Sequence, residues 1–362
     1  MKMRIQYVIA TLDVGGAERQ LTALATGLDP TRFEVEVLVL TRGGRFEEEL
    51  KDASIPYHIL DKRPGIDPFC LPRLWRHMRR FRPHVVHTWM FTGGAFGRTA
   101  GLLSRTPRLV MSERSAYMSR SMIHRVVDTA LARTTDVTLG NSTAVVTWFK
   151  EYARAQQGRT QVIANGLDLA AYPKQPTATS SKVPVLMTVC RMSPVKRLDI
   201  LLLACKRLVD NGVSFRLELV GDGESRPAVD AQIVALDLSS VVMCHGNQKD
   251  VPSYLQRADI FVLTSDHEGL PNAVMEAMAC HLPVVATRAG GTVDLVTEDT
   301  GILVDCGDVD ALATALEALI HNAEQRVQFG VNGRKRIEEG FSMDAMVRQH
   351  EVLYQTLMPE SR

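Results

Sequence analysis

The sequence predicts an α/β protein made of two doubly wound domains, each built on a parallel β-sheet. Its 362 residues suit two ordinary domains. Short apolar strands alternate with helical patterns along the chain, and residues 171–183, rich in turn formers and poor in apolar residues, separate two such series. We therefore expect domains at residues 1–175 and 176–340. The segment 341–362 has helical spacing and either caps the second domain or crosses back onto the first.

In the first domain, near-continuous apolar runs are typical of parallel strands that are buried on both faces of a sheet. Strands are expected at 4–10, 33–40, 85–87, 108–111, 137–139 and 162–163. Helices are expected at 17–28, 71–81 and 121–132, and after Gly94.

The second domain repeats this alternation, which predicts a second parallel sheet. Its strands are expected at 185–189, 215–220, 241–244, 259–264, 282–286 and 302–304. Ligands of such sheets bind beyond the carboxyl ends of the strands, so the loops that follow the strands are where a site is expected.

Composition limits the class of protein. With 45% hydrophobic and 23% charged residues, the chain is typical of a soluble globular protein. Its six cysteines form no CxxC pair, which indicates reduced thiols in a cytoplasmic protein, and no Cys and His cluster predicts a zinc site. No signal peptide is evident, and no run approaches the roughly 20 apolar residues that span a bilayer.

Charge is divided unequally between the halves. Residues 1–175 carry 25 Lys and Arg against 16 Asp and Glu, whereas the remainder carries 17 against 25. A basic first half and an acidic second half suggest different partners for the two. The basic residues lack a nucleic-acid recognition motif, so we expect no nucleic acid among these partners.

The first candidate site follows the predicted strand at 259–264. There the chain reads Ser-Asp-His-Glu-Gly-Leu-Pro-Asn over residues 265–272 before a helix predicted at 273–280. A helix start binds anions such as a diphosphate, and Gly269 allows the backbone to approach closely. Glu268 and Glu276 flank this start and can accept hydrogen bonds from sugar hydroxyls. The alternative for Glu268 is a carboxylate that complements the helix dipole. The alternative for Glu276 is a solvated helical residue.

The second candidate cluster follows the strand at 185–189. Arg191, Lys196 and Arg197 lie on one loop, where cations can neutralise a diphosphate without a metal ion and stabilise it as a leaving group. A basic surface turn is the alternative. Gly221-Asp222-Gly223 is a weaker signal, and residues 308–310, Asp-Val-Asp, begin a helix and predict a cap.

These residues resemble the large retaining glycosyltransferase family with the GT-B fold, family 4 in the usual classification. The resemblance covers nearly the whole chain and rests on the order of five motifs. They are Gly15-Gly16-Ala17-Glu18-Arg19, Asn165-Gly166-Leu167-Asp168, Arg191 with Lys196, Gly221-Asp222-Gly223, and Glu268 with Glu276.

The resemblance implies roles for individual residues. Arg191 and Lys196 would bind the donor diphosphate, Glu268 the transferred sugar and Glu276 the ribose, so that Arg191, Lys196 and Glu268 carry catalysis. The remaining donor contacts would be Gly15, Gly16, Gly221, Gly269, Leu270 and Asn272. No cofactor and no metal are expected, and attack would occur on the front face of the sugar.

On the acceptor side, the sequence departs from the family pattern. Members often carry a histidine after the strand that here ends at Met111, whereas this chain has Ser112-Glu113-Arg114. Glu113 is a candidate substitute. His87 is either an acceptor contact or a structural residue. Relatives with these motifs act in bacterial surface-polysaccharide or lipid-linked oligosaccharide assembly, which implies an NDP-sugar donor, a UDP-sugar in the first instance, and a saccharide or polyprenyl-linked acceptor.

A basic amphipathic helix at 71–82 carries Trp and Phe on its apolar side. Such helices can lie in an anionic membrane interface, which would place the protein on the inner face of the cell membrane; alternatively, the apolar stripe packs on the sheet. Two rival functions remain open, a nucleotide-sugar epimerase and a non-catalytic nucleotide-sugar sensor. A dehydrogenase is disfavoured because no complete GxGxxG motif opens either domain.

Overall fold

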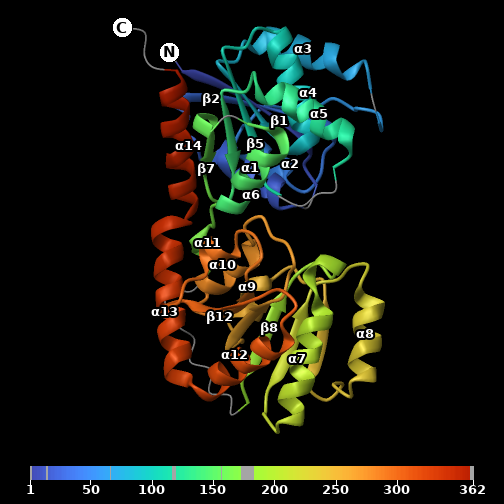
Figure 1. The fold of residues 1–362 in the computed structure, drawn as a ribbon. Coiled ribbons are helices and arrows are strands. Elements are labelled where there is room, and N and C mark those ends of the chain that lie inside the picture. Colours follow the sequence, from blue (N-terminus) through green and yellow to red (C-terminus); the bar gives the residue numbers. More distant parts are fainter. Residues whose placement is uncertain are drawn as a thin grey trace. The chain divides into compact units, whose positions relative to one another are not determined.

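The computed structural model describes residues 2–13, 15–65, 67–115, 120–155, 157–172 and 183–358. It comprises two compact units (Figure 1). The N-terminal unit is Met1–Gly166 with Met343–Arg362, and the C-terminal unit is Leu167–Ser342. The expected boundary at 175–176 and most of the expected linker lie outside the described residues. Helix α14 (Met343–Leu357) forms part of the N-terminal unit.

A seven-stranded sheet in the order β3-β2-β1-β4-β5-β6-β7 is the centre of the N-terminal unit. Its pairings are all parallel. The strands are β1 (Met3–Thr11), β2 (Phe33–Arg42), β3 (Tyr57–Ile59), β4 (Val85–Trp89), β5 (Arg108–Glu113), β6 (Val137–Gly140) and β7 (Thr160–Val162). The short edge strand β3 was not expected. The winding direction changes between β1 and β4, which defines a topological switch point.

Helices cover both faces of this sheet. Successive side chains of a strand point to opposite faces, so each strand contributes to two cores. Tyr7 and Ile9 of β1 pack in one core with residues of α1 and α14, whereas Val8 packs in another with residues of α3 and α4. The helices are α1 (Gly16–Gly27), α2 (Glu47–Asp52), α3 (Cys70–Phe81), α4 (Met90–Leu103), α5 (Met122–Ala132) and α6 (Thr143–Ala153), with η1 (Gln157–Arg159).

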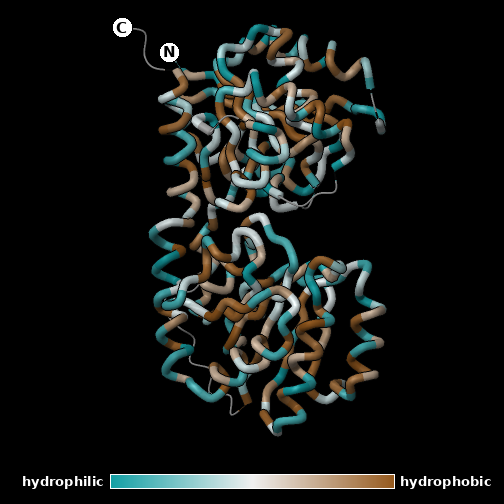
Figure 2. Tube along the Cα trace, viewed as in Figure 1, coloured by the Kyte–Doolittle hydropathy of each residue, from teal (hydrophilic) through white to brown (hydrophobic). Residues whose placement is uncertain are grey.

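The C-terminal unit repeats the plan with a six-stranded parallel sheet in the order β10-β9-β8-β11-β12-β13. Its strands are β8 (Val185–Val189), β9 (Arg216–Val220), β10 (Val242–Gly246), β11 (Ile260–Leu263), β12 (Val284–Thr287) and β13 (Gly301–Val304). The switch point here lies between β8 and β11. In both units the hydrophobic residues follow the strands and the inner helix faces (Figure 2).

The helices of this unit are η2 (Leu169–Ala171), η3 (Pro194–Lys196), α7 (Leu198–Asp210), α8 (Arg226–Ala235), α9 (Val251–Leu255), α10 (Asn272–Ala279), α11 (Thr292–Leu295), α12 (Val309–His321) and α13 (Ala323–Gly340). The helix expected at 273–280 begins one residue earlier, with Pro271 as its N-cap. Asp308 caps α12 by accepting a hydrogen bond from the amide of Ala311 at 2.9 Å, as expected. Among the described residues, none of the helices is long and apolar enough to cross a membrane.

Candidate functional site

Two loops meet at the switch point of the C-terminal sheet, because β8 and β11 are neighbours and their carboxyl ends lie at one edge. The loop after β8 carries Lys196, and the loop after β11 carries Glu268. Lys196 Nζ lies 2.5 Å from Glu268 Oε1, which also accepts a hydrogen bond from Ser265 Oγ at 2.6 Å. The two charged side chains retain 20% and 10% exposure. This accessible ion pair is the centre of the candidate site.

Hydrogen bonds between the two loops fix the position of the pair. The amide of Asp266 donates to the carbonyl of Val195 at 2.9 Å, and Thr264 Oγ1 donates to the carbonyl of Lys196 at 2.9 Å. Thr287 Oγ1, from the end of β12, donates to the carbonyl of Ser265 at 2.5 Å. Because backbone groups of both loops take part, the geometry of the pair is set by the fold.

Gly290 lies against the backbone of Glu268, and the sequence reasoning missed it. It lies in the loop after β12 with φ +51°, and a Cβ atom there would sit 1.9 Å from the carbonyl oxygen of Glu268. Only glycine tolerates both conditions. The Gly290-Gly291 pair, which begins three residues after β12 ends, was the available signal.

Arg191 lies on the same loop as Lys196 but is far more exposed. Its guanidinium Nη2 lies 3.0 Å from Glu224 Oε2, with side-chain exposures of 75% and 51%. The loop is held at Met192, whose amide donates to the carbonyl of Asp222 at 2.9 Å. Gly221 makes this approach possible, because at φ +121° its Cβ position lies 1.9 Å from the carbonyl oxygen of Cys190.

The start of α10 lies at the end of the Glu268 loop. Asn272 is the first helical residue, and Gly269 and Leu270 precede it. Glu276 is four residues further along, so it lies on the same helix side as Asn272, with 8% of its surface exposed. The first amides of a helix and its dipole attract anions. The predicted donor residues of this segment are therefore close in space.

In the N-terminal unit, the predicted glycines lie at the carboxyl end of β1, beside that sheet's switch point. Gly15 is the N-cap of α1 and Gly16 is its first residue. Glu18, in the first turn, accepts a hydrogen bond from Thr11 Oγ1 at 2.8 Å. The donor role of both glycines stays a prediction.

His87, an acceptor-side candidate, is completely buried in β4. Its Nδ1 lies 2.7 Å from the hydroxyl of Tyr354, and its Nε2 lies 2.8 Å from Ser112 Oγ. Burial, together with nearby His350 and Arg114, holds the pKa of His87 well below its usual value. Both ring nitrogens are engaged inside the unit, which favours the structural alternative for His87.

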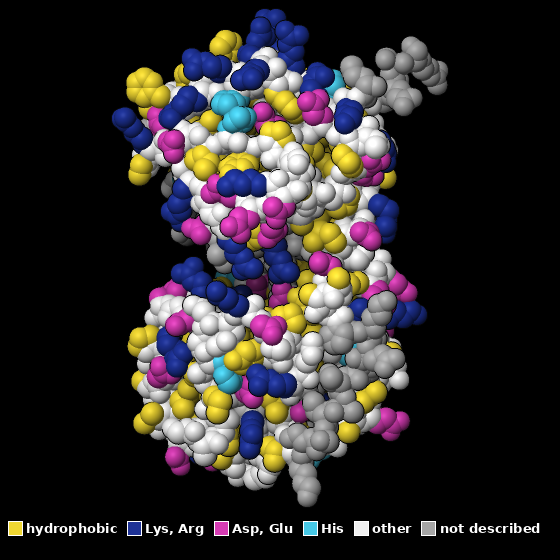
Figure 3. All heavy atoms as spheres, turned by 180° about the vertical axis from the view of Figure 1, so that it is seen from behind, with side chains coloured by type: hydrophobic (Ala, Val, Ile, Leu, Met, Phe, Trp, Pro, Cys, Tyr) yellow, Lys and Arg dark blue, Asp and Glu magenta, His cyan; other side chains and the backbone are white. Residues whose placement is uncertain are grey.

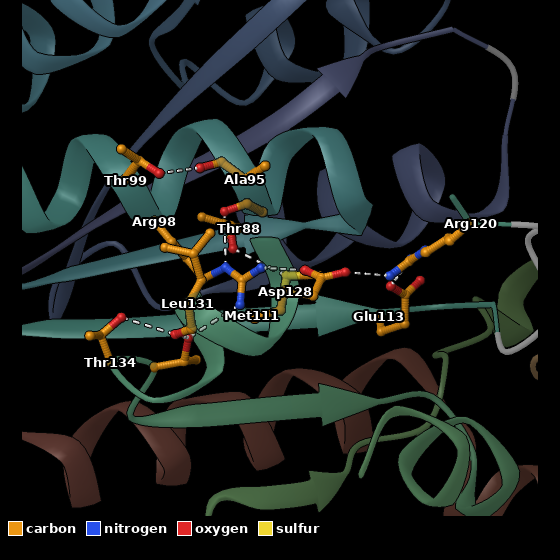
Figure 4. Close-up of polar contacts among 12 residues, drawn as sticks. Thr88, Ala95, Arg98, Thr99, Met111, Glu113, Arg120, Asp128, Leu131 and Thr134 are labelled. Atoms are coloured by element: carbon orange, nitrogen blue, oxygen red, sulfur yellow. Dashed lines mark hydrogen bonds and ion pairs between the residues drawn. The ribbon is translucent and has the colours of Figure 1, made fainter. Parts of the chain in front are cut away.

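Glu113, the second acceptor-side candidate, belongs to a buried group of four charged residues that we call the charge cluster (Figure 4). It consists of Arg98, Glu113, Arg120 and Asp128. Asp128 lies 2.7 Å from Arg98 and 2.9 Å from Arg120, and Arg120 also pairs with Glu113. All four side chains are at most 2% exposed.

The two carboxylates and two guanidinium groups of the charge cluster balance one another. Glu113 Oε1 also accepts the backbone amide of Arg114 at 3.1 Å. Burial raises the pKa of Glu113, and Arg120 opposes this rise. The carboxylate is thus engaged at both oxygens, which makes it an anchor for the end of β5 in this structure. The sequence reasoning missed Arg98, Arg120 and Asp128, because no sequence motif links them to Glu113.

The family model for "Glycosyltransferase Family 4" matches residues 14–171, and that for "Glycosyl transferases group 1" matches residues 173–336. The chain is 27% identical over 338 residues to the lipopolysaccharide core biosynthesis glycosyltransferase LpsE of Rhizobium meliloti, covering 92% of this chain and 93% of the relative. It is 31% identical over 179 residues to the capsular polysaccharide biosynthesis glycosyltransferase CapM of Staphylococcus aureus, covering 49% and 47%.

Among solved structures, Anabaena Alr3699/HepE in complex with UDP superimposes with a TM-score of 0.85. The sequence identity is 23%, and the superposition covers 98% of this chain and 100% of that chain. This likeness supports the fold, while the two family models, taken together, span both units and include the Lys196–Glu268 pair. The chain therefore belongs to the family 4 glycosyltransferases, with the two Rossmann-like domains of the GT-B fold.

Proposed function

We propose that this glycosyltransferase is retaining and metal-independent, and that it transfers a sugar from a UDP-sugar to a saccharide or polyprenyl-linked acceptor during assembly of a bacterial surface glycan. The observation that carries the proposal is the accessible Lys196–Glu268 pair at the switch point of the C-terminal sheet. In this proposal, Lys196 binds the diphosphate and Glu268 binds the sugar hydroxyls. Support comes from their separation, which is one hydrogen bond.

In this proposal, Lys196 and Arg191 stabilise the leaving nucleoside diphosphate. An ammonium group has three N–H donors, so Lys196 can keep one on Glu268 while the others meet phosphate oxygens. Arg191 can exchange its exposed partner Glu224 for phosphate, because exposed ion pairs contribute little. Charge that develops on the diphosphate as the glycosidic bond breaks is then met by fixed cations.

Glu268 positions the sugar through its hydroxyl groups, and Glu276 contacts the ribose. The acceptor hydroxyl attacks the anomeric carbon from the side of the leaving group, and its proton passes to an oxygen of the departing diphosphate. The new glycosidic bond thus replaces the broken one on the same face, and configuration is retained. Glu113 is not given the role of base, because Arg120 and the Arg114 amide occupy its oxygens.

The donor and acceptor classes are proposed from relatives. LpsE is named for lipopolysaccharide core biosynthesis and CapM for capsular polysaccharide biosynthesis. HepE has been crystallised with UDP and with UDP-glucose. These names favour a UDP-sugar and a growing glycan as the substrates of this chain.

Peripheral binding to the cytoplasmic face of the membrane through α3 is part of the same proposal. Leu74 and Met78 of α3 pack in the core of the N-terminal unit, so the apolar stripe is mostly used inside the unit. Trp75 is 43% exposed, and the surrounding arginines Arg76, Arg79 and Arg80 are exposed. Binding would therefore rest on one aromatic anchor and several cations.

The transfer reaction is tested with a panel of nucleotide-sugars, with and without a polyprenyl-linked acceptor extract, in EDTA. The proposal expects UDP release that requires acceptor, persists in EDTA, is lost in Glu276→Ala, and yields a product with the donor's anomeric configuration by NMR. Sugar conversion without acceptor would identify an epimerase instead. Donor binding without turnover across all acceptors would identify a sensor.

Membrane binding is tested separately by sedimentation with vesicles at low salt. We expect recovery on anionic vesicles that falls in Trp75→Ala and in the triple variant Arg76→Gln, Arg79→Gln, Arg80→Gln. Equal recovery on neutral and anionic vesicles would overturn the membrane proposal and leave the transferase proposal intact.

A further inference from the structure

The N-terminal unit brings together three side chains whose chemistry is unrelated to the switch-point residues. Glu36 lies in β2, His58 in β3 and His77 in α3. They are separated by 22 and 19 residues in the sequence. One ligand atom from each lies within 4.8 Å of those of the other two.

The sheet register explains this meeting. Leu38 pairs with His58, and Glu36 lies two residues before Leu38, so Glu36 and His58 are diagonal neighbours on one face. The same face carries Leu38 and Leu40, which pack in one core with Leu74 and Met78 of α3. His77 directly precedes Met78 and is therefore held against this edge of the sheet.

The local contacts favour a ligand set over a simple ion pair. His58 Nε2 lies 3.2 Å from Glu36 Oε1, and the His58 and His77 rings have centroids 4.5 Å apart. Gln6, the register partner of Glu36, donates to the other carboxylate oxygen and so fixes the buried carboxylate from behind. Such outer contacts orient metal-binding carboxylates. Within the described part of the chain, the imidazole nitrogens of His77 make no hydrogen bond.

We propose that Glu36, His58 and His77 form a binding site for Zn²⁺ that links the edge strand β3 to α3. Zinc bonds of about 2.0–2.2 Å separate two tetrahedral ligand atoms by about 3.4 Å, close to the existing Glu36–His58 distance. The third ligand needs a rotation of the half-buried His77 ring. A carboxylate and two imidazoles form a ligand set that zinc accepts, with water in the fourth position.

The residues around the three proposed ligands determine the expected affinity for Zn²⁺. Burial, the neighbouring His58 and the arginines Arg80 and Arg76 lower the pKa of His77. The same arginines repel a cation, which favours a site of moderate affinity. Figure 3 shows histidine side chains (cyan) at the surface of the N-terminal unit among Lys and Arg side chains.

The test uses the full chain after treatment with EDTA and measures binding of Zn²⁺ by calorimetry and of Co²⁺ by visible absorption. We expect one Zn²⁺ per chain at this site, an intense Co²⁺ spectrum of four-coordinate type, and a higher melting temperature with Zn²⁺. His77→Ala and His58→Ala should each weaken binding about tenfold or more and remove the four-coordinate spectrum. Glu36→Gln should do the same while retaining the shape of the side chain.

His321→Ala is the matched control, because His321 is an exposed histidine of α12 in the other unit. It should leave zinc affinity and the Co²⁺ spectrum unchanged. Melting in EDTA shows whether each variant folds before metal is added. Zinc affinity that is the same in wild type and His77→Ala, or a Co²⁺ spectrum of six-coordinate type, would overturn the proposal.

Discussion

The charge cluster of the N-terminal unit and the Lys196–Glu268 pair of the C-terminal unit use the same kinds of side chain in opposite ways. Arg98, Asp128, Arg120 and Glu113 are at most 2% exposed and are joined by several hydrogen bonds. Lys196 and Glu268 remain 20% and 10% exposed. Charges removed from water and bonded to one another have little capacity for a ligand, whereas a pair at the open end of a sheet can exchange partners.

The two groups of charged side chains are also held in position by different contacts. The charge cluster is joined by ion pairs between side chains, and its members come from α4, β5, α5 and Arg120, which lies two residues before α5. The Lys196–Glu268 pair is held by backbone groups of two loops and by the close approach of Gly290. Because backbone contacts position the two loops, the side chains of Lys196 and Glu268 stay available for a ligand.

Replacing Asp128 by Ala should give the largest loss of stability. Two guanidinium groups would remain buried with one carboxylate, which should lower the free energy of unfolding by about 3–5 kcal/mol. The chain's three tryptophans, Trp75, Trp89 and Trp148, all lie in the N-terminal unit, so urea unfolding followed by their fluorescence reports that unit. Asp13→Ala, which breaks the exposed pair with Arg42, is the control and should cost less than about 1 kcal/mol. Equal losses of unfolding free energy in Asp128→Ala and Asp13→Ala would contradict the special role given to the buried charge cluster.

Replacing Lys196 by Ala should reverse the pattern, with a large effect on activity and a small one on stability. Loss of a fixed cation at a leaving group should lower kcat/KM by about 10²–10³-fold. The melting temperature should stay within a few degrees of wild type, because the pair is partly solvated. Lys206→Ala, which removes another lysine ion pair in the same unit, should preserve kcat/KM. A stable, fully active Lys196→Ala enzyme would contradict the proposed donor site.

Lowering the pH from 7.5 to 5.5 should weaken the N-terminal unit. His87 and His350 are fully buried, and burial lowers the pKa of His350 to about 3 and that of His87 well below its usual value. Below pH 6.5 the unfolded chain takes up protons that the folded unit excludes, so stability is lost as the pH falls. Two such groups should cost about 3 kcal/mol at pH 5.5.

The measurement is urea unfolding followed by tryptophan fluorescence at each pH. His350→Phe should roughly halve this part of the pH dependence, whereas His321→Ala should leave it unchanged. A pH profile of His350→Phe that matches wild type would show that the buried histidines are not its cause.

Replacing Gly290 by Ala should lower both the stability of the C-terminal unit and its activity. A left-handed backbone at a residue with a Cβ costs about 1–2 kcal/mol, and the new methyl group would also press on the Glu268 carbonyl. We expect a matching fall in kcat/KM through displacement of Glu268. Gly212→Ala, at φ +75° with no atom close to its Cβ position, carries the backbone cost alone and should keep kcat/KM.

Much of the fold could be predicted because its signal is local. The apolar strands β8 and β2, the helix α3 and the cap at Asp308 follow from hydrophobic periodicity and side-chain chemistry within a few residues. The three-residue strand β3 was missed, because so short a segment has no periodicity. The start of α10 was placed one residue too late, because a sequence pattern locates a helix end only to within one or two residues.

The candidate site was predictable in part for a similar reason. Lys196 and Glu268 each follow a strand, and parallel topology brings such loops to one edge. Gly290 could not be assigned, because its contact with Glu268 depends on how the loops after β11 and β12 pack. The structural use of His87 depends on Tyr354, which lies 267 residues away in α14.

The sequence by itself determined the two doubly wound units, the loops that carry the candidate site, and the family. Those features depend on short-range patterns that any register of the same strands would preserve. Only the tertiary structure decided that Glu113 is enclosed by Arg120, that His87 is a core residue, and that Glu36, His58 and His77 meet. Each of these depends on sheet register and helix packing, which join residues that have no local signal in common.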